Sequence, residues 1–287
     1  MLPQRHAGLS ARQALVLSDR AAMLDGALSP VSRDSPCGPD LEEIGDRDFL
    51  NFLVTMEGLL PTGWIPVDAP SIDFSSALTI GDALLARTQD VRLIVLLAKL
   101  AIRNRDLDSF AARLATLAWL LANHWNEAHP RGNNDDFAER MGQLQTLDER
   151  EAVQRPLRNT PLVSSQRGSV SFDAYAAAVG APALRPTVEG YANVELSRGW
   201  TTAAIDQIVA DADLAALVHT YESVLSIKAS VSQMEALSLR KCGFVQAPNF
   251  RNLSPLLDGV RVFISGAIEK KHIDAHFRAW KPRQQDV

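Results

Sequence analysis

Cysteine is scarce in this sequence, and long apolar runs are missing. Its two cysteines, Cys37 and Cys242, lie too far apart to suggest a disulfide framework, so a reducing compartment is the simpler interpretation. The N-terminal residues lack an apolar core of signal-peptide length. The most apolar segment, residues 91–102, is shorter than the ~20 residues needed to cross a bilayer, and Lys99 interrupts it. We therefore expect a cytoplasmic protein with no membrane span.

An excess of basic charge is also missing. The net charge is −5 and the pI is about 5.7, whereas binding to nucleic acid requires a concentrated basic face. Nucleic acid is therefore excluded as the main partner. The composition, 46% hydrophobic and 22% charged, is typical of a soluble globular protein, and 287 residues suffice for about two domains that each have a core.

The familiar catalytic patterns are absent from the sequence. We find no Gly-rich phosphate loop, no G-x-S-x-G elbow and no paired-cysteine zinc pattern. Cys37 lies in the stretch SPCGPD, where no neighbouring residue is a histidine that could activate a thiol. We interpret Cys37 as a turn residue, and we expect no catalytic residue, no bound metal and no cofactor.

The stretch NHWNEAHP, residues 123–130, is the first that looks chemical. His124 and Glu127 are three residues apart and could share a helix face, but His129 lies about 140° around a helix from His124. Zinc-binding histidines on a helix prefer a spacing of four, so this spacing fits poorly. We interpret the stretch as a helix end at which Trp125 packs and His129 bonds to carbonyls of the last turn. A metal-dependent hydrolase is the alternative.

A second pair of histidines near the C-terminus has better spacing. His272 and His276 are four residues apart, but Ile273 stands where the metalloprotease motif has glutamate. Ile273, Phe277 and Trp280 share one face of the same predicted helix. Three interpretations remain open for this segment: a solvated terminal helix, a partner-binding face that includes Phe277 and Trp280, and a metal site.

Apolar periodicity predicts helices over most of the chain. In the first half they cover residues 48–59, 75–87, 91–103, 106–125 and 135–152, with 91–103 buried on all sides. In the second half they cover residues 171–180, 201–209 and 212–237, followed by one that begins at Ser254. Residues 154–172 have room for a short extended piece. Three residues are predicted N-caps: Asp106, Ser171 and Ser254.

The fold class is therefore expected to be all-α, with two helical domains. The boundaries that we predict are an N-terminal extension (1–24), a helical domain (25–165), a connector (166–200), a smaller helical hairpin or bundle (201–270) and a basic C-terminal tail (271–287). Within the connector, prolines and glycines indicate an exposed link.

Several motifs, taken in order, resemble the ImpA-like N-terminal domain family, which is found in the TssA subunit of type VI secretion systems. The family's Pro-Cys-Gly-x-Asp-Leu signature matches residues 36–41, and its Asp-Leu-Arg-Leu segment is similar to residues 90–93, where Val91 replaces the first leucine. Its Tyr-Trp-Asp-x-x-His-Pro segment is similar to residues 124–130, and its Leu-Ser-Pro-Leu segment is similar to residues 253–256. The structural motif residues are Pro36, Cys37, Gly38, Asp40, Leu41, Asp90, Arg92, Trp125, His129 and Pro130.

The resemblance implies a non-enzymatic subunit that assembles a type VI secretion system by protein–protein docking. Its implied partners are baseplate, sheath, tube and membrane-complex subunits, its implied place is the cytoplasmic side of the inner membrane, and a homo-oligomer stays open. We expect partner surfaces near Trp200, Phe277 and Trp280, because aromatic anchors concentrate binding energy. A helical adaptor outside secretion is the other alternative.

The sequence departs from the family pattern in three places. Phe74 stands where the family has tryptophan, and residues 1–22 precede the usual start, so that Met23 is a candidate initiator. Nineteen residues follow Ile268, and we therefore expect the ring-forming C-terminal domain of longer members to be missing.

Overall fold

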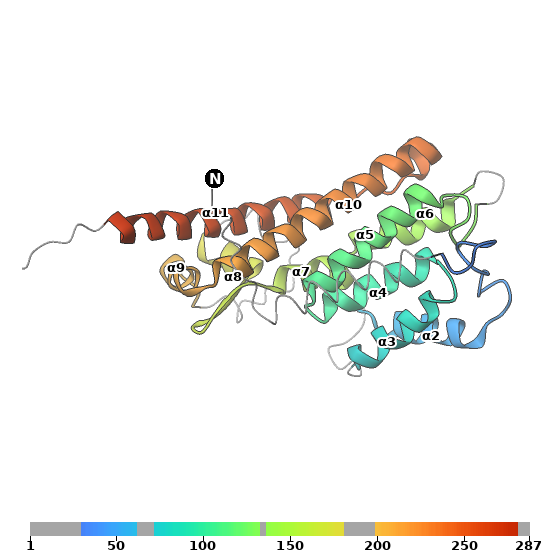
Figure 1. Cartoon of the computed structure of the whole chain (residues 1–287), viewed down its shortest axis with the longest axis horizontal. Coiled ribbons are helices and arrows are strands. Elements are labelled where there is room, and N and C mark those ends of the chain that lie inside the picture. The colour runs from blue at the N-terminus through green and yellow to red at the C-terminus, as the bar shows by residue number, and fades with distance from the viewer. Residues whose placement is uncertain (1–29, 62–71, 133–135, 181–198, 281–287) are drawn as a thin grey trace, which may run out of the picture.

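The structure, a computed structural model, describes residues 30–61, 72–132, 136–180 and 199–280, with side chains up to residue 272. Helices make up most of it (Figure 1). The helices are α2 (Arg47–Leu59), α3 (Phe74–Leu85), α4 (Val91–Arg103), α5 (Leu107–Asn123), α6 (Ala138–Gln145), α7 (Arg155–Asn159), α8 (Phe172–Ala178), α9 (Thr202–Asp211), α10 (Leu214–Gln246) and α11 (Leu253–Trp280).

Helix α4 lies at the centre of the first block, by which we mean helices α2 to α7. Its residues from Val91 to Ile102 are all buried, which confirms the prediction of a helix that is apolar on all sides. Lys99 is tolerated there because its ammonium group reaches the edge of the core and pairs with Glu149 at 2.8 Å. Helix α5 packs along α4, and this pair forms the platform on which the rest of the chain is arranged (Figure 1).

Most of the helices begin at a side chain that accepts a backbone N–H of the first turn. Asp106 accepts from Ser109 and Ser171 accepts from Ala174, which confirms both as N-caps. Carboxylates also cap helices α2, α3, α4 and α10. These caps are Asp46, Asp73, Asp90 and Asp213.

Helices α10 and α11 form a long antiparallel hairpin, and α10 packs along α5 (Figure 1). Polar contacts help to fix the α5–α10 pairing: His219 Nε2 lies 2.8 Å from one carboxylate oxygen of Asp108, and the Ser223 hydroxyl donates to the other at 2.6 Å. One hydrophobic cluster includes buried residues from both predicted domains. The division into domains at the boundaries given above stays a prediction.

The expectation of a purely α-helical fold needs correction. Strands β1 (Pro161–Ser165) and β2 (Gly168–Ser171) pair antiparallel, so the predicted extended piece within residues 154–172 is confirmed. Both strands lie against α9. The described part of the chain is thus predominantly helical and includes one small sheet.

The single helix predicted over residues 135–152 is wrong in its continuity. It is divided into α6, a 3-10 turn (Thr146–Asp148) and a π-helical turn (Arg150–Gln154), with Glu149 extended between the two turns. The Asp148 carboxylate at this break accepts the backbone N–H groups of Asn252 at 3.1 Å and Leu253 at 2.6 Å. Helix α11 is therefore capped by a distant residue, and the predicted cap at Ser254, which lies inside the helix, is wrong.

Within the described ranges, every helix is too short or too polar to span a bilayer.

Candidate functional site

The predicted motif residues come together at one end of the first block. We call this region the motif junction: residues 36–41, 89–92 and 125–130, together with Arg140. Backbone hydrogen bonds join its segments, from Gln89 N–H to the Cys37 carbonyl at 2.8 Å and from Val91 N–H to the His129 carbonyl at 2.8 Å. Three sequence-distant segments thus meet at the start of the buried helix α4.

Gly38 is required by the backbone of the junction. Its φ is +70°, and an added Cβ would lie 2.4 Å from the carbonyl oxygen of Arg87. The Gly38 carbonyl lies 3.0 Å from His129 Nε2, so this ring nitrogen carries the proton and donates. The glycine of the motif therefore allows the motif loop to approach the connection between α3 and α4 closely.

The prediction for His129 is wrong in its partner. Helix α5 ends at Asn123, and His124 departs from helical geometry with φ −130° and ψ 39°. His129 therefore lies beyond the helix, bound to Gly38 rather than to carbonyls of the last turn. Trp125 is also outside the helix, yet it is buried, with its ring 5.1 Å from that of Phe137. The prediction that Trp125 is packed is confirmed, although the residue lies in the turn after α5 and not in the helix.

Arg92 lies among four carboxylates. Its guanidinium pairs with Asp90 at 2.6 Å, Asp40 at 3.2 Å and Glu139 at 3.4 Å, and it also contacts Glu42. Burial raises the pKa of Asp90 to about 7, and the charges of Asp40 and Glu139 add to this effect while backbone N–H donors oppose it. A single guanidinium cannot neutralise four carboxylates, so the most buried one holds a proton most readily.

Arg140 holds the loop after α5 from inside. It is fully buried and donates to the carbonyls of Trp125 at 2.6 Å, Ala128 at 2.6 Å and Pro130 at 2.7 Å. Burial lowers its pKa to about 10, which still leaves it charged at neutral pH. Its central role was not predicted, although its spacing from Phe137 and Leu144 places it on the buried face of α6.

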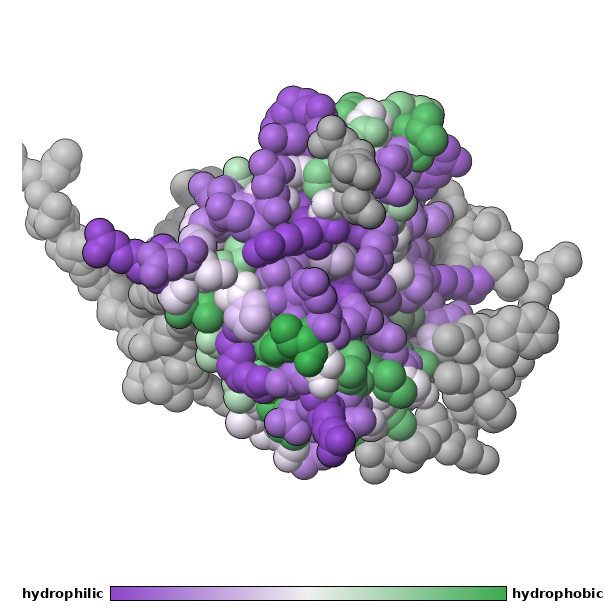
Figure 2. All heavy atoms as spheres, turned by 90° about the vertical axis from the view of Figure 1, so that its right-hand side faces the viewer, coloured by the Kyte–Doolittle hydropathy of each residue, from purple (hydrophilic) through white to green (hydrophobic). Residues whose placement is uncertain are grey.

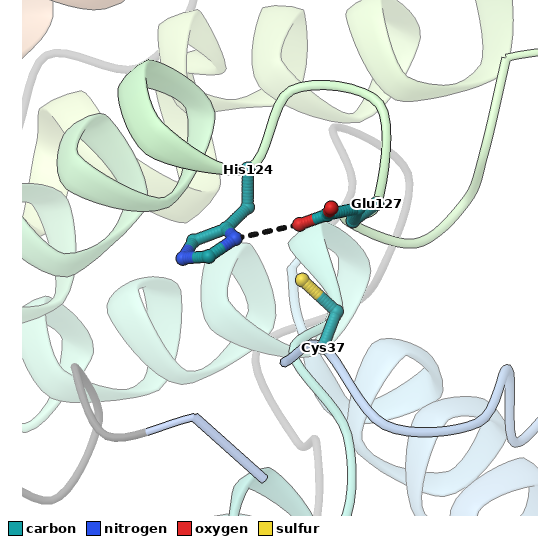
Figure 3. A group of neighbouring side chains, drawn as sticks. All are labelled: Cys37, His124 and Glu127. Atoms are coloured by element: carbon teal, nitrogen blue, oxygen red, sulfur yellow. Dashed lines mark hydrogen bonds and ion pairs between the residues drawn. The ribbon is translucent and has the colours of Figure 1, made fainter. Parts of the chain in front are cut away.

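A cysteine, a histidine and a glutamate meet at the outer edge of the junction (Figure 3). Cys37 comes from the motif loop, and His124 and Glu127 come from the turn after α5. His124 Nδ1 lies 2.7 Å from a Glu127 oxygen, and one ligand atom of each residue lies within 4.8 Å of the others. The sequence therefore misled on Cys37, because the fold supplies a histidine that is distant in the chain.

The other predicted chemical sets are not assembled in this way. His129 bonds to Gly38 and is not part of the three-residue group, so the combination of His124, Glu127 and His129 does not form among the described residues. His272 is exposed on α11, and the side chain of its predicted partner His276 lies outside the described residues. Burial raises the pKa of the Cys37 thiol to about 11, which disfavours a free nucleophilic thiolate.

The end of α10 exposes apolar side chains that the sequence did not reveal. We call residues 239–246 the α10 tip. Phe244 is 81% exposed and Val245 is 94% exposed, just after Gly243, whose φ of +72° interrupts the helix. Arg240 and Lys241 are also exposed there. Figure 2 views the molecule from this end and shows an apolar area at the top of the face, bordered by polar surface.

The three predicted partner anchors have different positions. Trp200 is half-buried and packs against the hydrophobic core, so it is in part a structural residue. Phe277 and Trp280 fall within α11, but their side chains lie outside the described residues. Their role as partner anchors stays a prediction.

Comparison with known proteins gives two matches of different kinds. Residues 28–149 match the family model described as ImpA, N-terminal, type VI secretion system. The fold is similar to a solved structure, the N-terminal domain including the conserved ImpA_N region of the TssA component of the type VI secretion system from Burkholderia cenocepacia. That match has a TM-score of 0.64 at 19% identity and covers 94% of this chain and 99% of the other. No curated protein matches the sequence.

The family match covers the segments that carry the first three motifs. The family match spans the motif loop, α4, the loop after α5 and Arg140, whereas the structural similarity extends the shared fold to the hairpin of α10 and α11. Together they support the assignment of this chain as a component of a type VI secretion system. Residues 28–149 are similar to the ImpA N-terminal region of that system, as their motifs predict.

Proposed function

We propose that this chain is a non-enzymatic assembly subunit of a type VI secretion system that acts by protein–protein docking at the baseplate or the sheath–tube end. Its partners are baseplate, sheath, tube or membrane-complex subunits, and it acts on the cytoplasmic side of the inner membrane. The family match over residues 28–149 and the shared fold support the system. The docking mode needs a separate physical argument.

The exposure of Phe244 and Val245 is the observation that carries this argument. Large apolar side chains lose unfavourable contact with water when a partner covers them, and aromatic residues dominate the binding energy of many interfaces. The α10 tip holds these two side chains 81% and 94% exposed. Its neighbours Arg240 and Lys241 add positive charge, which favours a partner surface that is apolar at its centre and acidic at its rim.

The two ends of α6 hold the end of α10 and the residues that follow it. Gln246 Oε1 accepts the backbone N–H of Phe137 at 3.4 Å, and Gln145 exchanges two hydrogen bonds with the backbone of Asn249, at 2.8 and 3.0 Å. These contacts tie the end of α10 to both ends of α6. The family region thus positions a surface that lies outside residues 28–149.

Binding to purified secretion subunits tests the proposal. The full chain is titrated with baseplate, sheath, tube and membrane-complex subunits, and at least one is expected to bind. A Phe244→Ser/Val245→Ser double variant should weaken that binding by tenfold or more, as loss of about 1.4 kcal/mol requires. Val262→Ser, a change at a 55% exposed apolar position on α11, is the matched control and should bind normally.

Two failures have different meanings. If no subunit binds the unmodified chain, the proposed function is wrong. If a subunit binds the double variant as tightly as the unmodified chain, docking uses another surface, and alanine variants of Trp200, Phe277 and Trp280 then test the anchors predicted from sequence. The Trp200 variant requires a melting control, because that side chain also packs against the core.

A further inference from the structure

The group formed by Cys37, His124 and Glu127 has no part in the docking function proposed above. Cys37 is buried, whereas the side chains of His124 and Glu127 are 22% and 52% exposed, so the group is open on the solvent side. Figure 3 shows the thiol below the contact between His124 Nδ1 and the Glu127 carboxylate, with all three side chains directed toward a common point. Cys37 comes from the motif loop, whereas His124 and Glu127 come from the turn after α5.

We propose that Cys37, His124 and Glu127 form a site for one Zn²⁺ ion. Sulfur, imidazole nitrogen and carboxylate oxygen are the three ligand types that zinc uses in proteins, and three protein ligands leave a fourth tetrahedral position for water. One ligand atom of each residue lies within 4.8 Å of the others, which is close to the spacing that zinc imposes.

Small side-chain movements would complete the coordination. Zinc bonds of about 2.3 Å to sulfur and 2.0–2.2 Å to nitrogen and oxygen require ligand atoms roughly 3.3–3.8 Å apart. The distance of 2.7 Å between His124 Nδ1 and the Glu127 oxygen must therefore increase slightly, and both side chains must move toward the Cys37 sulfur. His124 and Glu127 have the freedom to move because they are partly exposed, whereas the Cys37 backbone is fixed by the bond from Gln89.

The charges of such a site balance. On binding, the Cys37 thiol releases its proton to water. The neutral His124 ring takes the tautomer with its proton on Nε2, so that Nδ1 offers its lone pair to the ion, and the Glu127 carboxylate exchanges its bond from Nδ1–H for the metal. One thiolate and one carboxylate then neutralise the two charges of the ion. The ion would join the loop 36–41 to the turn 124–128 and so clamp the outer edge of the motif junction.

Metal binding to the full chain tests the site. The apo protein is titrated with Zn²⁺ in competition with a chromogenic chelator, and one equivalent should bind. His124→Gln and Glu127→Gln should each weaken binding by tenfold or more, whereas Cys242→Ser and His272→Gln, which change residues outside the group, should have no effect. Affinity should rise by about tenfold per pH unit below the thiol pKa, because one proton is released.

A cobalt titration identifies the sulfur ligand. Co²⁺ in place of zinc should give a near-ultraviolet thiolate charge-transfer band that Cys242→Ser keeps and Cys37→Ser loses. The histidine and glutamate variants keep the test valid if Cys37→Ser fails to fold, because those two side chains are partly exposed. Binding below a tenth of an equivalent, or binding that His124→Gln and Glu127→Gln leave unchanged, would overturn the proposal. Neither result bears on docking by the α10 tip.

Discussion

A folded protein usually buries apolar groups and exposes charged ones, and both the motif junction and the α10 tip depart from that arrangement. The junction buries charge: Arg140 and Asp90 are fully covered, and each is bonded to several partners. The tip exposes apolar surface at Phe244 and Val245. Both arrangements cost free energy unless something compensates. In the junction the compensation lies within the chain, whereas at the tip it would come from a partner.

This difference separates two meanings of a sequence motif. The junction contains the residues that identify the family, and their contacts show that they hold loops in place around the start of α4. The tip carries no recognisable motif, and it is the better candidate for docking. We expect substitutions in the junction to change stability first, and substitutions at the tip to change binding first.

Arg140→Met should have the largest effect. It leaves the carbonyls of Trp125, Ala128 and Pro130 buried without their donor, and each such loss costs about 1–3 kcal/mol, so we expect the free energy of unfolding to fall by about 5 kcal/mol. Urea denaturation measures it. Arg131→Met changes an exposed arginine of the same loop and should leave stability almost unchanged. Equal effects of the two variants would show that Arg140 does not hold the loop.

Trp125→Ala should have the second-largest effect on stability. The indole is 6% exposed, packs edge-on against Phe137 and lies under the Arg140 guanidinium at 5.3 Å, so its removal should cost about 3–5 kcal/mol. His124→Ala, next to it in the chain, should cost less than about 1 kcal/mol because the ring is partly exposed. Thermal and urea unfolding of the two variants compare a packing role with a surface role. A large loss in His124→Ala would contradict this interpretation of the turn.

The sequence predicted the helices of this protein better than their ends. The continuous apolar pattern of residues 91–103 identified α4, and the carboxylate Asp106 identified the start of α5, because both signals are local. The end of α5 was placed too late, since Trp125 continues the apolar pattern although the backbone has already turned. Periodicity detects which side chains are buried, and a buried turn residue satisfies it as well as a helical one does.

Contacts between distant segments could not be predicted from one sequence. Asp148 caps α11, and Cys37 meets His124, only because the fold brings these segments together. Arg140 is an intermediate case: its place on the apolar face of α6 was visible, but the carbonyls that it binds lie on another segment. The exposure of the α10 tip could not be predicted for a similar reason. Leu239, Phe244 and Val245 are apolar residues of the kind that also form cores, and only the fold shows that they are exposed.

The pH dependence of stability tests the charge cluster around Arg92. Burial raises the pKa of Asp90 from 3.8 to about 7, so the folded protein binds a proton that the unfolded chain has lost between these values. The contribution of Asp90 to stability is therefore complete below pH 3.8 and is lost as the pH rises through 7. Its slope cannot exceed about 1.4 kcal/mol per pH unit.

Asp90→Asn removes this titration and keeps a side chain that caps α4. The free energy of unfolding, measured from pH 5 to pH 8, should therefore fall more steeply with rising pH in the unmodified chain than in the variant. His129 acts in the opposite sense, since burial lowers its pKa and its contribution is lost as the pH falls. That effect cancels in the difference between the two proteins. Parallel curves would mean that Asp90 does not titrate in this range.

Asp148→Ala tests a carboxylate that joins residues 28–149 to the start of α11. Its oxygens accept from the backbone N–H groups of Asn252 and Leu253 and from the Asn252 side chain at 2.9 Å. Loss of a helix cap costs about 0.5–2 kcal/mol, and we expect a value near 1–2 because two N–H groups are affected. Glu222→Ala, at an exposed position of α10, is the control for removal of a carboxylate. Equal melting temperatures of the two variants would show that the cap contributes little.

Phe244→Ser should have the smallest effect on stability, and it tests the difference between the α10 tip and the motif junction most directly. The ring is 81% exposed, so its removal takes little apolar surface out of the core, and the free energy of unfolding should change by no more than about 0.5 kcal/mol. The solubility of the free chain should rise, because an exposed apolar patch favours non-specific association. A loss above about 2 kcal/mol, measured by urea denaturation, would mean that Phe244 packs within the protein. The tip would then be a structural element like the junction, and the argument that it serves docking would fail.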